Sequence, residues 1–365
     1  MFAQVATPTA LVDLDVFEAN AHRGKVRAAG LGVALRPHAK TVKSPDLLAG
    51  ILGPETRGLT VSTLGEIRAL AVVVDDLLYA VAVAAGKASS VLAALGDADL
   101  RLTLVVDSVA GLAGVPQDPR IDVAIEIDCD GHRGGMSPDD PVLSELAARV
   151  ATGYRLAGVM THGGGSYLGS KAHVVSVASQ EREAVVGAAR RLRDDGHDIA
   201  MVSVGSTPTF AAVDHLEGVT DARPGVYLFG DLSTEFLGAC GPSDLALSVL
   251  ATVIGSADGG RTSFIDAGWS ALSQDRGVPA MAGSTGLGRV AKPGTRPSEA
   301  ALIVSAANQE HGFVTAPDGG PTRLAIGERV QVWPNHACAT GEMHHRLTLV
   351  RGGEVVGSAV RPRGW

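Results

Sequence analysis

Eight short apolar runs, alternating with helix-like segments, fill the first two-thirds of the chain and restrict its fold more than any other feature. They are rich in β-branched and other apolar residues, as buried strands are. Between most of them lie Ala-, Leu-, Glu- and Arg-rich segments with helical spacing, such as 141–151 and 180–194. The runs occupy 32–40, 58–63, 76–83, 101–108, 121–128, 156–163, 199–206 and 222–230. The alternation predicts an α/β fold with a (β/α)8 TIM-type barrel, and the count of eight favours it over an open doubly wound sheet.

The pattern changes from about Leu232. Beyond it, strand-like runs follow one another with turn signals between them and few helical patterns, for example at 245–256, 329–340 and 346–360. We therefore expect a barrel domain at 13–232. Residues 1–12 and 233–365 are expected to form a second, mostly β domain, to which the N-terminal segment contributes a strand.

Composition excludes several classes of protein. The 365-residue chain has a net charge of −8 and no basic block, which argues against nucleic-acid binding. Apolar stretches such as 69–85 are broken by acidic residues, and the N-terminus lacks a signal-peptide pattern, so no membrane association is expected. The three cysteines, Cys129, Cys240 and Cys338, are too far apart for a disulfide framework, which is typical of a cytoplasmic protein.

Chemically versatile side chains follow the predicted strands. Reacting groups of barrel enzymes sit where the strands end at their carboxyl termini. At those ends the sequence places Lys40, Ser62, Thr63, Arg133, His162, Tyr167, Ser206, Thr207 and Gly225.

The loops after the seventh and eighth strands resemble a phosphate cradle. Glycine-bearing loops at this place in a barrel bind phosphate through backbone N–H groups and hydroxyls. The candidate donors lie in "VGSTPT" and "RPGVY" and are Gly205, Ser206, Thr207, Gly225 and Val226. A phosphate site opposite Lys40, on the first strand, points to pyridoxal 5'-phosphate, whose aldehyde bonds to a lysine amine.

A second cluster lies in "PNHACAT". His336 and Cys338 are two residues apart, so on an extended strand both side chains would point to one face. Imidazole and thiolate together suit Zn²⁺, and two protein ligands leave positions open for substrate and water.

Taken in order, several motifs resemble the D-serine dehydratase / D-threonine aldolase family of fold-type III pyridoxal phosphate enzymes, related to the N-terminal domain of alanine racemase. They are "RPHAKT", "TLGEI", "IEIDCDGHRGG", "THGGGSY", "VSVGSTPT", "RPGVY", "LSQDRG", "QEHG" and "PNHAC". The resemblance covers nearly the whole chain and is closer to the zinc-dependent D-serine dehydratase branch, since D-threonine aldolases often carry an aspartate at the position of Cys338.

The resemblance implies roles for individual residues. Lys40 would form the Schiff base with the cofactor and then act as the base at Cα, and Arg133 would lie near the ring oxygen. The other cofactor contacts would be Tyr167, Ser206, Thr207, Gly225 and Val226. His336 and Cys338 would bind Zn²⁺ or another divalent metal such as Mn²⁺. Candidate substrate contacts are His38, His311 and Asp275.

The activity implied is a lyase reaction on a D-β-hydroxy amino acid. The main expectation is dehydration of D-serine, or of a substrate like D-3-hydroxyaspartate, to a 2-keto acid and ammonia. D-Threonine aldolase-type cleavage to glycine and an aldehyde, an amino-acid racemase and a non-catalytic cofactor carrier are the alternatives. By the same resemblance we expect a homodimer.

Two residues depart from the family pattern. Val42 replaces a histidine that commonly follows the lysine, and Met160 replaces an aromatic residue seven positions before Tyr167. Both changes leave the preferred substrate open.

Overall fold

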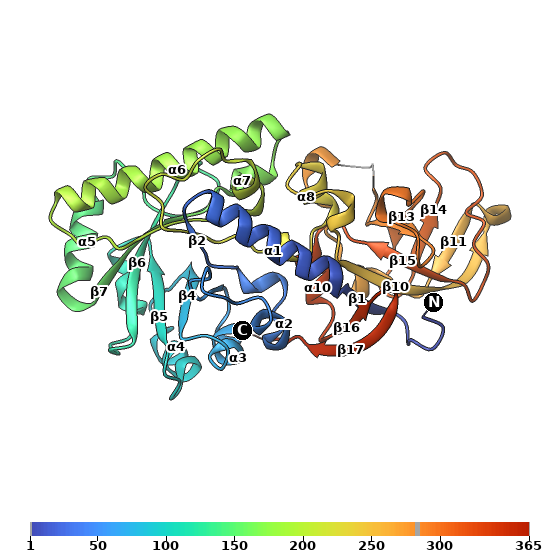
Figure 1. Cartoon of the computed structure of the whole chain (residues 1–365), viewed down its shortest axis with the longest axis horizontal. Coiled ribbons are helices and arrows are strands. Elements are labelled where there is room, and N and C mark those ends of the chain that lie inside the picture. Colours follow the sequence, from blue (N-terminus) through green and yellow to red (C-terminus); the bar gives the residue numbers. More distant parts are fainter. Residues whose placement is uncertain (1, 282–284, 365) are drawn as a thin grey trace. The chain divides into compact units, whose positions relative to one another are not determined.

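The computed structural model describes residues 2–281 and 285–364 (Figure 1). The chain forms two compact units. The first unit comprises Met1–His22 and Val226–Arg361, and the second comprises Arg23–Gly225 and Pro362–Trp365. They are called the β unit and the barrel unit below. Helix α1 (Leu14–Gly30) runs from one into the other.

The barrel unit contains eight parallel strands in the order β2-β9-β8-β7-β6-β5-β4-β3. They are β2 (Ala34–Leu35), β3 (Leu59–Val61), β4 (Asp76–Ala82), β5 (Arg101–Val106), β6 (Ile121–Ile127), β7 (Arg155–Thr161), β8 (Met201–Val204) and β9 (Asp221–Ala222). Parallel bridges from Leu35 to Thr56 and from His38 to Thr60 join the last strand back to the first. The ring is therefore closed, which confirms the predicted barrel and excludes the open sheet.

Helices and short 3-10 turns connect these strands (Figure 1). The helices are α2 (Pro45–Ala49), α3 (Leu64–Leu70), α4 (Ala88–Leu95), α5 (Val142–Gly153), α6 (Lys171–Asp194) and α7 (Thr207–Ala212). The turns are η1 (Ala39–Thr41), η2 (Ala110–Gly114) and η3 (Gly164–Tyr167). In α5 the buried residues Leu143, Leu146, Ala147 and Val150 recur at helical spacing, and this apolar stripe faces the strands. Each buried leucine stabilises the packing by about 1.5–3 kcal/mol.

The barrel interior is apolar in its middle. Leu78, Val105, Ala124, Met160 and Met201 form one buried cluster there, contributed by neighbouring strands. Met160 is thus a core residue.

The β unit is built on a nine-stranded sheet in the order β11-β14-β13-β12-β15-β10-β1-β16-β17. Its strands are β1 (Thr9–Asp13), β10 (Leu247–Ala257), β11 (Thr262–Ile265), β12 (Arg289–Ala291), β13 (Leu302–Ala307), β14 (Gly312–Thr315), β15 (Arg329–Trp333), β16 (Arg346–Arg351) and β17 (Glu354–Val360). An additional β10–β11 pairing rolls part of the sheet into a barrel-like form. The expected N-terminal strand is confirmed, since β1 pairs antiparallel with β10 and parallel with β16.

Short helical elements interrupt this sheet. They are α8 (Leu232–Phe236), α9 (Trp269–Leu272) and α10 (Ala337–Glu342), with the turns η4 (Val226–Leu228), η5 (Pro242–Asp244), η6 (Asp258–Gly260), η7 (Pro279–Met281) and η8 (Pro297–Glu299). Alternate residues of β10, Val249, Ala251 and Val253, enter the core of the unit, as the two-residue period of a strand requires. None of the helices within 2–281 and 285–364 is long and apolar enough to cross a membrane.

Candidate active site

Lys40 lies on a rigid turn directly after β2. His38 caps this turn, because its Nδ1 accepts a hydrogen bond from the Lys40 backbone N–H at 3.3 Å. The backbone N–H of His38 in turn donates to the carbonyl of Pro224 at 3.0 Å, which ties the turn to the loop after β9. On its other side, buried Lys43 adopts a φ of 53° and forms an ion pair with buried Glu66 at 3.5 Å. The backbone that carries Lys40 is thus fixed at both ends.

The loops after β8 and β9 are closely packed, as a phosphate cradle requires. Ser206 caps α7, with its Oγ accepting the Thr209 N–H at 3.1 Å, and both Ser206 and Thr207 are buried. A Cβ at Gly225 would approach the His38 carbonyl oxygen to 2.9 Å, so only glycine fits against the Lys40 turn. Buried hydroxyls and a side-chain-free backbone therefore lie at the ends of β8 and β9, beside the lysine-bearing turn.

Positive charge accumulates at this end of the barrel. Burial lowers the pKa of His38 well below its usual value, and the charges of Lys40 and Arg223 act in the same direction. His162 shows the same effect: burial lowers its pKa most, followed by Arg133 and Lys40. Both imidazoles are thereby kept neutral among three cationic side chains. In a chain with a net charge of −8, this concentration of positive charge favours an anionic ligand.

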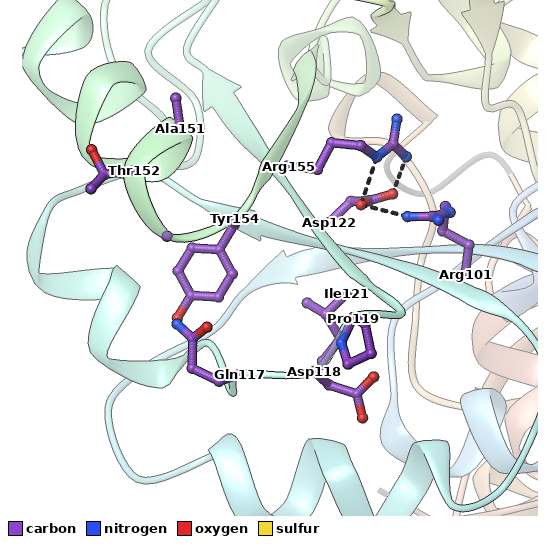
Figure 2. Close-up of a pocket in the computed structure, with 11 residues that line it drawn as sticks. Arg101, Gln117, Asp118, Pro119, Ile121, Asp122, Ala151, Thr152, Tyr154 and Arg155 are labelled. Atoms are coloured by element: carbon purple, nitrogen blue, oxygen red, sulfur yellow. Dashed lines mark hydrogen bonds and ion pairs between the residues drawn. The ribbon is translucent and has the colours of Figure 1, made fainter.

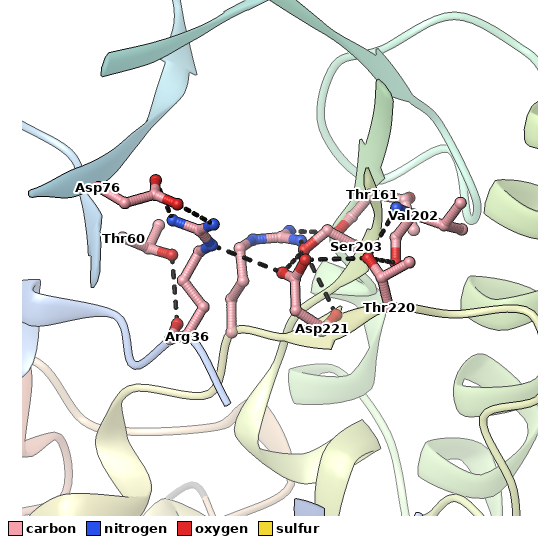
Figure 3. Close-up of polar contacts among 9 residues, drawn as sticks. Arg36, Thr60, Asp76, Thr161, Val202, Ser203, Thr220 and Asp221 are labelled. Atoms are coloured by element: carbon pink, nitrogen blue, oxygen red, sulfur yellow. Dashed lines mark hydrogen bonds and ion pairs between the residues drawn. The ribbon is translucent and has the colours of Figure 1, made fainter. Parts of the chain in front are cut away.

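A network of buried arginines supports the cradle from inside the barrel (Figure 3). Arg36 donates to both carboxylate oxygens of Asp76, at 2.8 and 3.0 Å, and its Nε lies 3.7 Å from Asp221. Arg223 donates from Nη1 to Ser203 Oγ at 2.6 Å. Burial lowers the pKa of Arg223. Sequence reasoning missed Arg223, although its position just before the Pro-Gly of "RPGVY" was a usable signal.

The remaining predicted cofactor contacts lie around the same end of the strands. Tyr167 closes η3, after β7, and is half-buried, whereas Arg133 is exposed in the loop after β6. Val226 follows Gly225 in the chain and is buried. Val42, the first departure from the family pattern, is fully buried behind the Lys40 turn. An apolar residue there fits its surroundings.

His336 and Cys338 lie in the β unit, but not on a strand as predicted. Strand β15 ends at Trp333, His336 is the residue before α10, and Cys338 lies in the first turn of that helix. Pro334 has no N–H with which to continue the ladder, and the Asp231 carboxylate accepts the Ala337 N–H at 2.9 Å, which starts the helix. The two side chains are nevertheless neighbours and hydrogen-bonded to each other.

The surroundings of His336 attract a cation. Its Nδ1 donates to Asp275 Oδ2 at 2.6 Å, which directs Nε2 away from that carboxylate. Burial disfavours the protonated imidazole, but Cys338, Asp275 and Asp231 outweigh it and raise the pKa of His336 to about 11. Thiolate sulfur and imidazole nitrogen are soft and borderline donors of the kind that Zn²⁺ prefers. Within the described ranges, no group of three or more His, Cys, Asp and Glu residues is arranged to hold a metal.

The two other candidate substrate contacts of the β unit differ in environment. Asp275 is committed to His336 and also accepts the Gly277 N–H at 2.8 Å, so it acts as a support for the imidazole. His311 is exposed, and its carbonyl accepts the Asn308 N–H at 2.8 Å.

A pocket of about 670 Å³ opens at the amino-terminal ends of the barrel strands (Figure 2). Buried Asp122 there accepts hydrogen bonds from Arg101 and Arg155, the first residues of β5 and β7. Lys40 follows the opposite, carboxyl-terminal end of its strand. Because the amino-terminal face of such barrels serves stability, we regard this pocket as structural.

Comparison with known proteins identifies the family. Residues 12–233 match the model of the alanine racemase N-terminal domain, and residues 246–350 match that of a serine dehydratase domain. The chain is 40% identical to the D-threo-3-hydroxyaspartate dehydratase of Delftia sp. strain HT23, covering 98% of each sequence. It is 27% identical to a D-serine dehydratase of Dictyostelium discoideum, over 98% of this chain and 96% of that one. It is also 29% identical to a D-threonine aldolase of Arthrobacter sp., over 97% and 91%.

The solved structure of the Delftia enzyme superposes on the whole of this chain and on 99% of its own, with a TM-score of 0.92 and 39% identity. A histidine-to-alanine variant and a metal-free cysteine-to-alanine variant of a D-threo-3-hydroxyaspartate dehydratase match equally closely, with TM-scores of 0.93 and 0.92. Fold, motifs and relatives agree, and the chain belongs to the D-serine dehydratase / D-threonine aldolase family of alanine racemase-like lyases.

Proposed function

We propose that this protein is a pyridoxal phosphate- and metal-dependent lyase that dehydrates D-β-hydroxy amino acids to a 2-keto acid and ammonia. The observation that carries the proposal is the group of cations at Lys40, Arg133 and Arg223, whose charges add to burial in lowering the pKa of both His38 and His162. Such a site suits a ligand that bears a phosphate and an amino-acid carboxylate. The dehydratases among the relatives support the same reaction.

The residues present fit the cofactor. Lys40 would bond to its aldehyde carbon, and buried Ser206 and Thr207 with the backbone of Gly225 and Val226 would receive its phosphate. Tyr167 and Arg133 would contact the ring. When bound, pyridoxal phosphate accepts the electron pair that is left when the Cα–H bond breaks. The amine of Lys40 would take that proton at its Nζ.

The residues of the β unit fit a divalent metal. His336 and Cys338 would hold it, and Asp275 would orient the imidazole through Nδ1. A bound Zn²⁺ or Mn²⁺ supplies Lewis acidity to a hydroxyl oxygen, which makes hydroxide a better leaving group. The histidine and cysteine exchanged in the two dehydratase variants are also two residues apart, and the cysteine variant is described as metal-free, which supports this assignment.

The preferred substrate is proposed to resemble D-threo-3-hydroxyaspartate, because the relative with 40% identity is named for it. Its second carboxylate would add to the negative charge that the cation-rich end of the barrel attracts. His38 and His311 remain candidate substrate contacts. A homodimer and a cytoplasmic location remain predictions.

Retro-aldol cleavage to glycine and an aldehyde is the second candidate function. The 29% identity with a D-threonine aldolase favours it, since the two reactions use the same groups. In that case a base would remove the proton of the β-hydroxyl, and the Cα–Cβ bond would break.

A product assay separates these functions. The purified protein, loaded with pyridoxal phosphate and Zn²⁺ or Mn²⁺, is given D-threo-3-hydroxyaspartate, D-serine or D-threonine, with L-serine as the control. We expect keto acid and ammonia in equal amounts from the first two and none from L-serine. Glycine and an aldehyde would establish the aldolase, and an inverted substrate would establish a racemase. No turnover of any D-substrate by the loaded protein would refute a lyase.

A further inference from the structure

One fully enclosed carboxyl group has not been given a role so far. Glu181 lies on α6 and is only 2% exposed. It occupies the inner face of the helix, between Val177 and Val185, where the spacing calls for an apolar residue. Burying a carboxyl group is costly unless it is hydrogen-bonded, so its position calls for a reason.

The contacts of Glu181 all lead to the ends of two barrel strands. Its Oε1 accepts the N–H groups of Gly163 and Gly205, at 2.7 and 3.1 Å, and its Oε2 accepts the hydroxyl of Thr209 at 2.6 Å. Gly163 comes shortly after β7, Gly205 follows β8, and Thr209 lies in α7. One side chain therefore links the loop after β7 to α7 and to the loop after β8, which carries Gly205, Ser206 and Thr207 of the cradle.

A chain of hydroxyls extends this support. Thr209 Oγ1 lies 2.9 Å from Ser206 Oγ, which lies 3.1 Å from Ser166 Oγ. Ser166 is the neighbour of Tyr167 and donates back to the Gly163 carbonyl at 2.7 Å. The hydrogen bonds therefore form a ring that starts at the N–H of Gly163, in the loop after β7, and ends at the carbonyl of the same residue.

The backbone is shaped to allow this approach. A Cβ at Gly163 would come within 2.8 Å of Val177 Cγ1 and 3.4 Å of Glu181 Cδ. The loop after β7 can therefore lie against α6, within reach of the carboxylate, only because residue 163 is glycine.

We propose that Glu181 is a positioning residue for the cofactor phosphate: it fixes the loops after β7 and β8 so that Ser206 and Thr207 meet the phosphate without rearrangement. This inference rests on the proposed function. Glu181 points from the helix toward the backbone of the loops and does not itself bind the anion. Its removal leaves two buried N–H groups without their acceptor and loosens the cradle.

Two substitutions of similar volume separate the hydrogen bonds from the packing. Glu181→Gln keeps an acceptor for both N–H groups and can donate to Thr209. Burial raises the pKa of Glu181, so a neutral amide is a fair substitute for it. Glu181→Met fills the same space and accepts no such hydrogen bond. Glu183→Ala, on the exposed face of the same helix, is the matched control for loss of one acidic side chain.

The readout is binding of the cofactor, measured with and without its phosphate. Dissociation constants for pyridoxal 5'-phosphate and for pyridoxal are obtained from absorbance titrations of the cofactor-free protein. We expect Glu181→Met to bind pyridoxal phosphate about 10- to 100-fold more weakly, while its affinity for pyridoxal changes less than about two-fold. Glu181→Gln and Glu183→Ala should stay within about three-fold of the parent for both ligands.

The outcomes distinguish this inference from the proposed function. If the parent protein binds neither pyridoxal phosphate nor pyridoxal, the proposed function fails. If the parent binds but Glu181→Met keeps its affinity, or loses equal affinity for both ligands, the positioning role is overturned. Should Glu181→Met not fold, the isosteric Thr209→Val removes the hydroxyl that links Glu181 to Ser206. A loss for pyridoxal phosphate alone then supports the role, and unchanged affinity overturns it.

Discussion

Histidines in the two units have opposite electrostatic environments. In the barrel unit, burial and neighbouring cations hold the pKa of His38 and His162 well below the usual range. In the β unit, the carboxylates and thiol around His336 overcome burial and raise its pKa to about 11. Imidazole side chains are thus kept neutral in the barrel unit, whereas the surroundings of His336 in the β unit favour its protonated form.

This difference supports the ligand proposed for each region. A group of cations that suppresses histidine protonation is suited to phosphate and carboxylate, whereas a group of anionic donors around an imidazole is suited to a metal ion. A third case lies at the other end of the strands, where Asp122 forms ion pairs with both Arg101 and Arg155 and opposite charges meet within the fold.

The most severe test of the anion-binding region is Lys40→Ala. Removal of the only group assigned to the covalent bond should abolish covalent attachment of the cofactor completely. After borohydride reduction and unfolding, mass spectrometry should find the cofactor on the parent chain and none on the variant. Lys43→Ala is the control, since Lys43 is paired with Glu66. A cofactor adduct that persists in Lys40→Ala would refute the assignment.

The cation-binding region is tested by Asp275→Asn. The amide retains the shape of the carboxylate but removes its charge from Nδ1 of His336, and loss of such a partner weakens metal binding about 10- to 100-fold. Competition with a chromogenic chelator measures the affinity for Zn²⁺. His336→Ala should lose the metal more completely, and both variants should still bind pyridoxal phosphate.

The control for this test is Asp318→Asn, a substitution at an exposed carboxylate of the same unit. It should bind Zn²⁺ as the parent does. Equal affinity in Asp275→Asn and the parent would show that Asp275 does not orient the imidazole.

The smallest expected effect is the pH dependence that His38 confers. Its pKa in the folded protein is lowered below the value of 6.5 expected when unfolded, so at lower pH only the unfolded chain takes up the proton. Stability therefore falls as the pH drops below about 6.5. His38→Asn keeps an acceptor for the Lys40 N–H but cannot titrate. Its free energy of unfolding should fall less steeply between pH 6.5 and 5, by up to about 1.4 kcal/mol per pH unit. Parallel curves from urea titrations would contradict the shift.

Local patterns in the sequence were sufficient for the barrel and for the position of Lys40 after its first strand. Alternating apolar and helical runs report the period of each element, and the position of a lysine after a strand follows from the barrel rule. Even β2, which is only two residues long, lies within a predicted run, and the equally short β9 overlaps one at Ala222.

Features that depend on distant partners were not predictable in this way. His336 and Cys338 were expected on a strand because the two-residue spacing was visible, whereas the capping of α10 by Asp231 was not. Likewise, Asp275 was a candidate substrate contact. Its hydrogen bond to His336, 61 positions away in the sequence, was visible only in the structure. Glu181 and Arg223 escaped notice because burial, not residue type, sets them apart.

The place of β1 inside the nine-stranded sheet determines the order in which the protein is completed during synthesis. Ala10 pairs with Leu347, so this strand leaves the ribosome 337 residues before one of its two partners (347 − 10). At about 5–20 residues per second the wait is roughly 20 to 70 s. The barrel unit has nearly all its residues by Gly225 and can fold during that interval. The β unit, and with it His336 and Cys338, is finished only when the last strands are made, so the proposed metal ligands are completed after the proposed cofactor site.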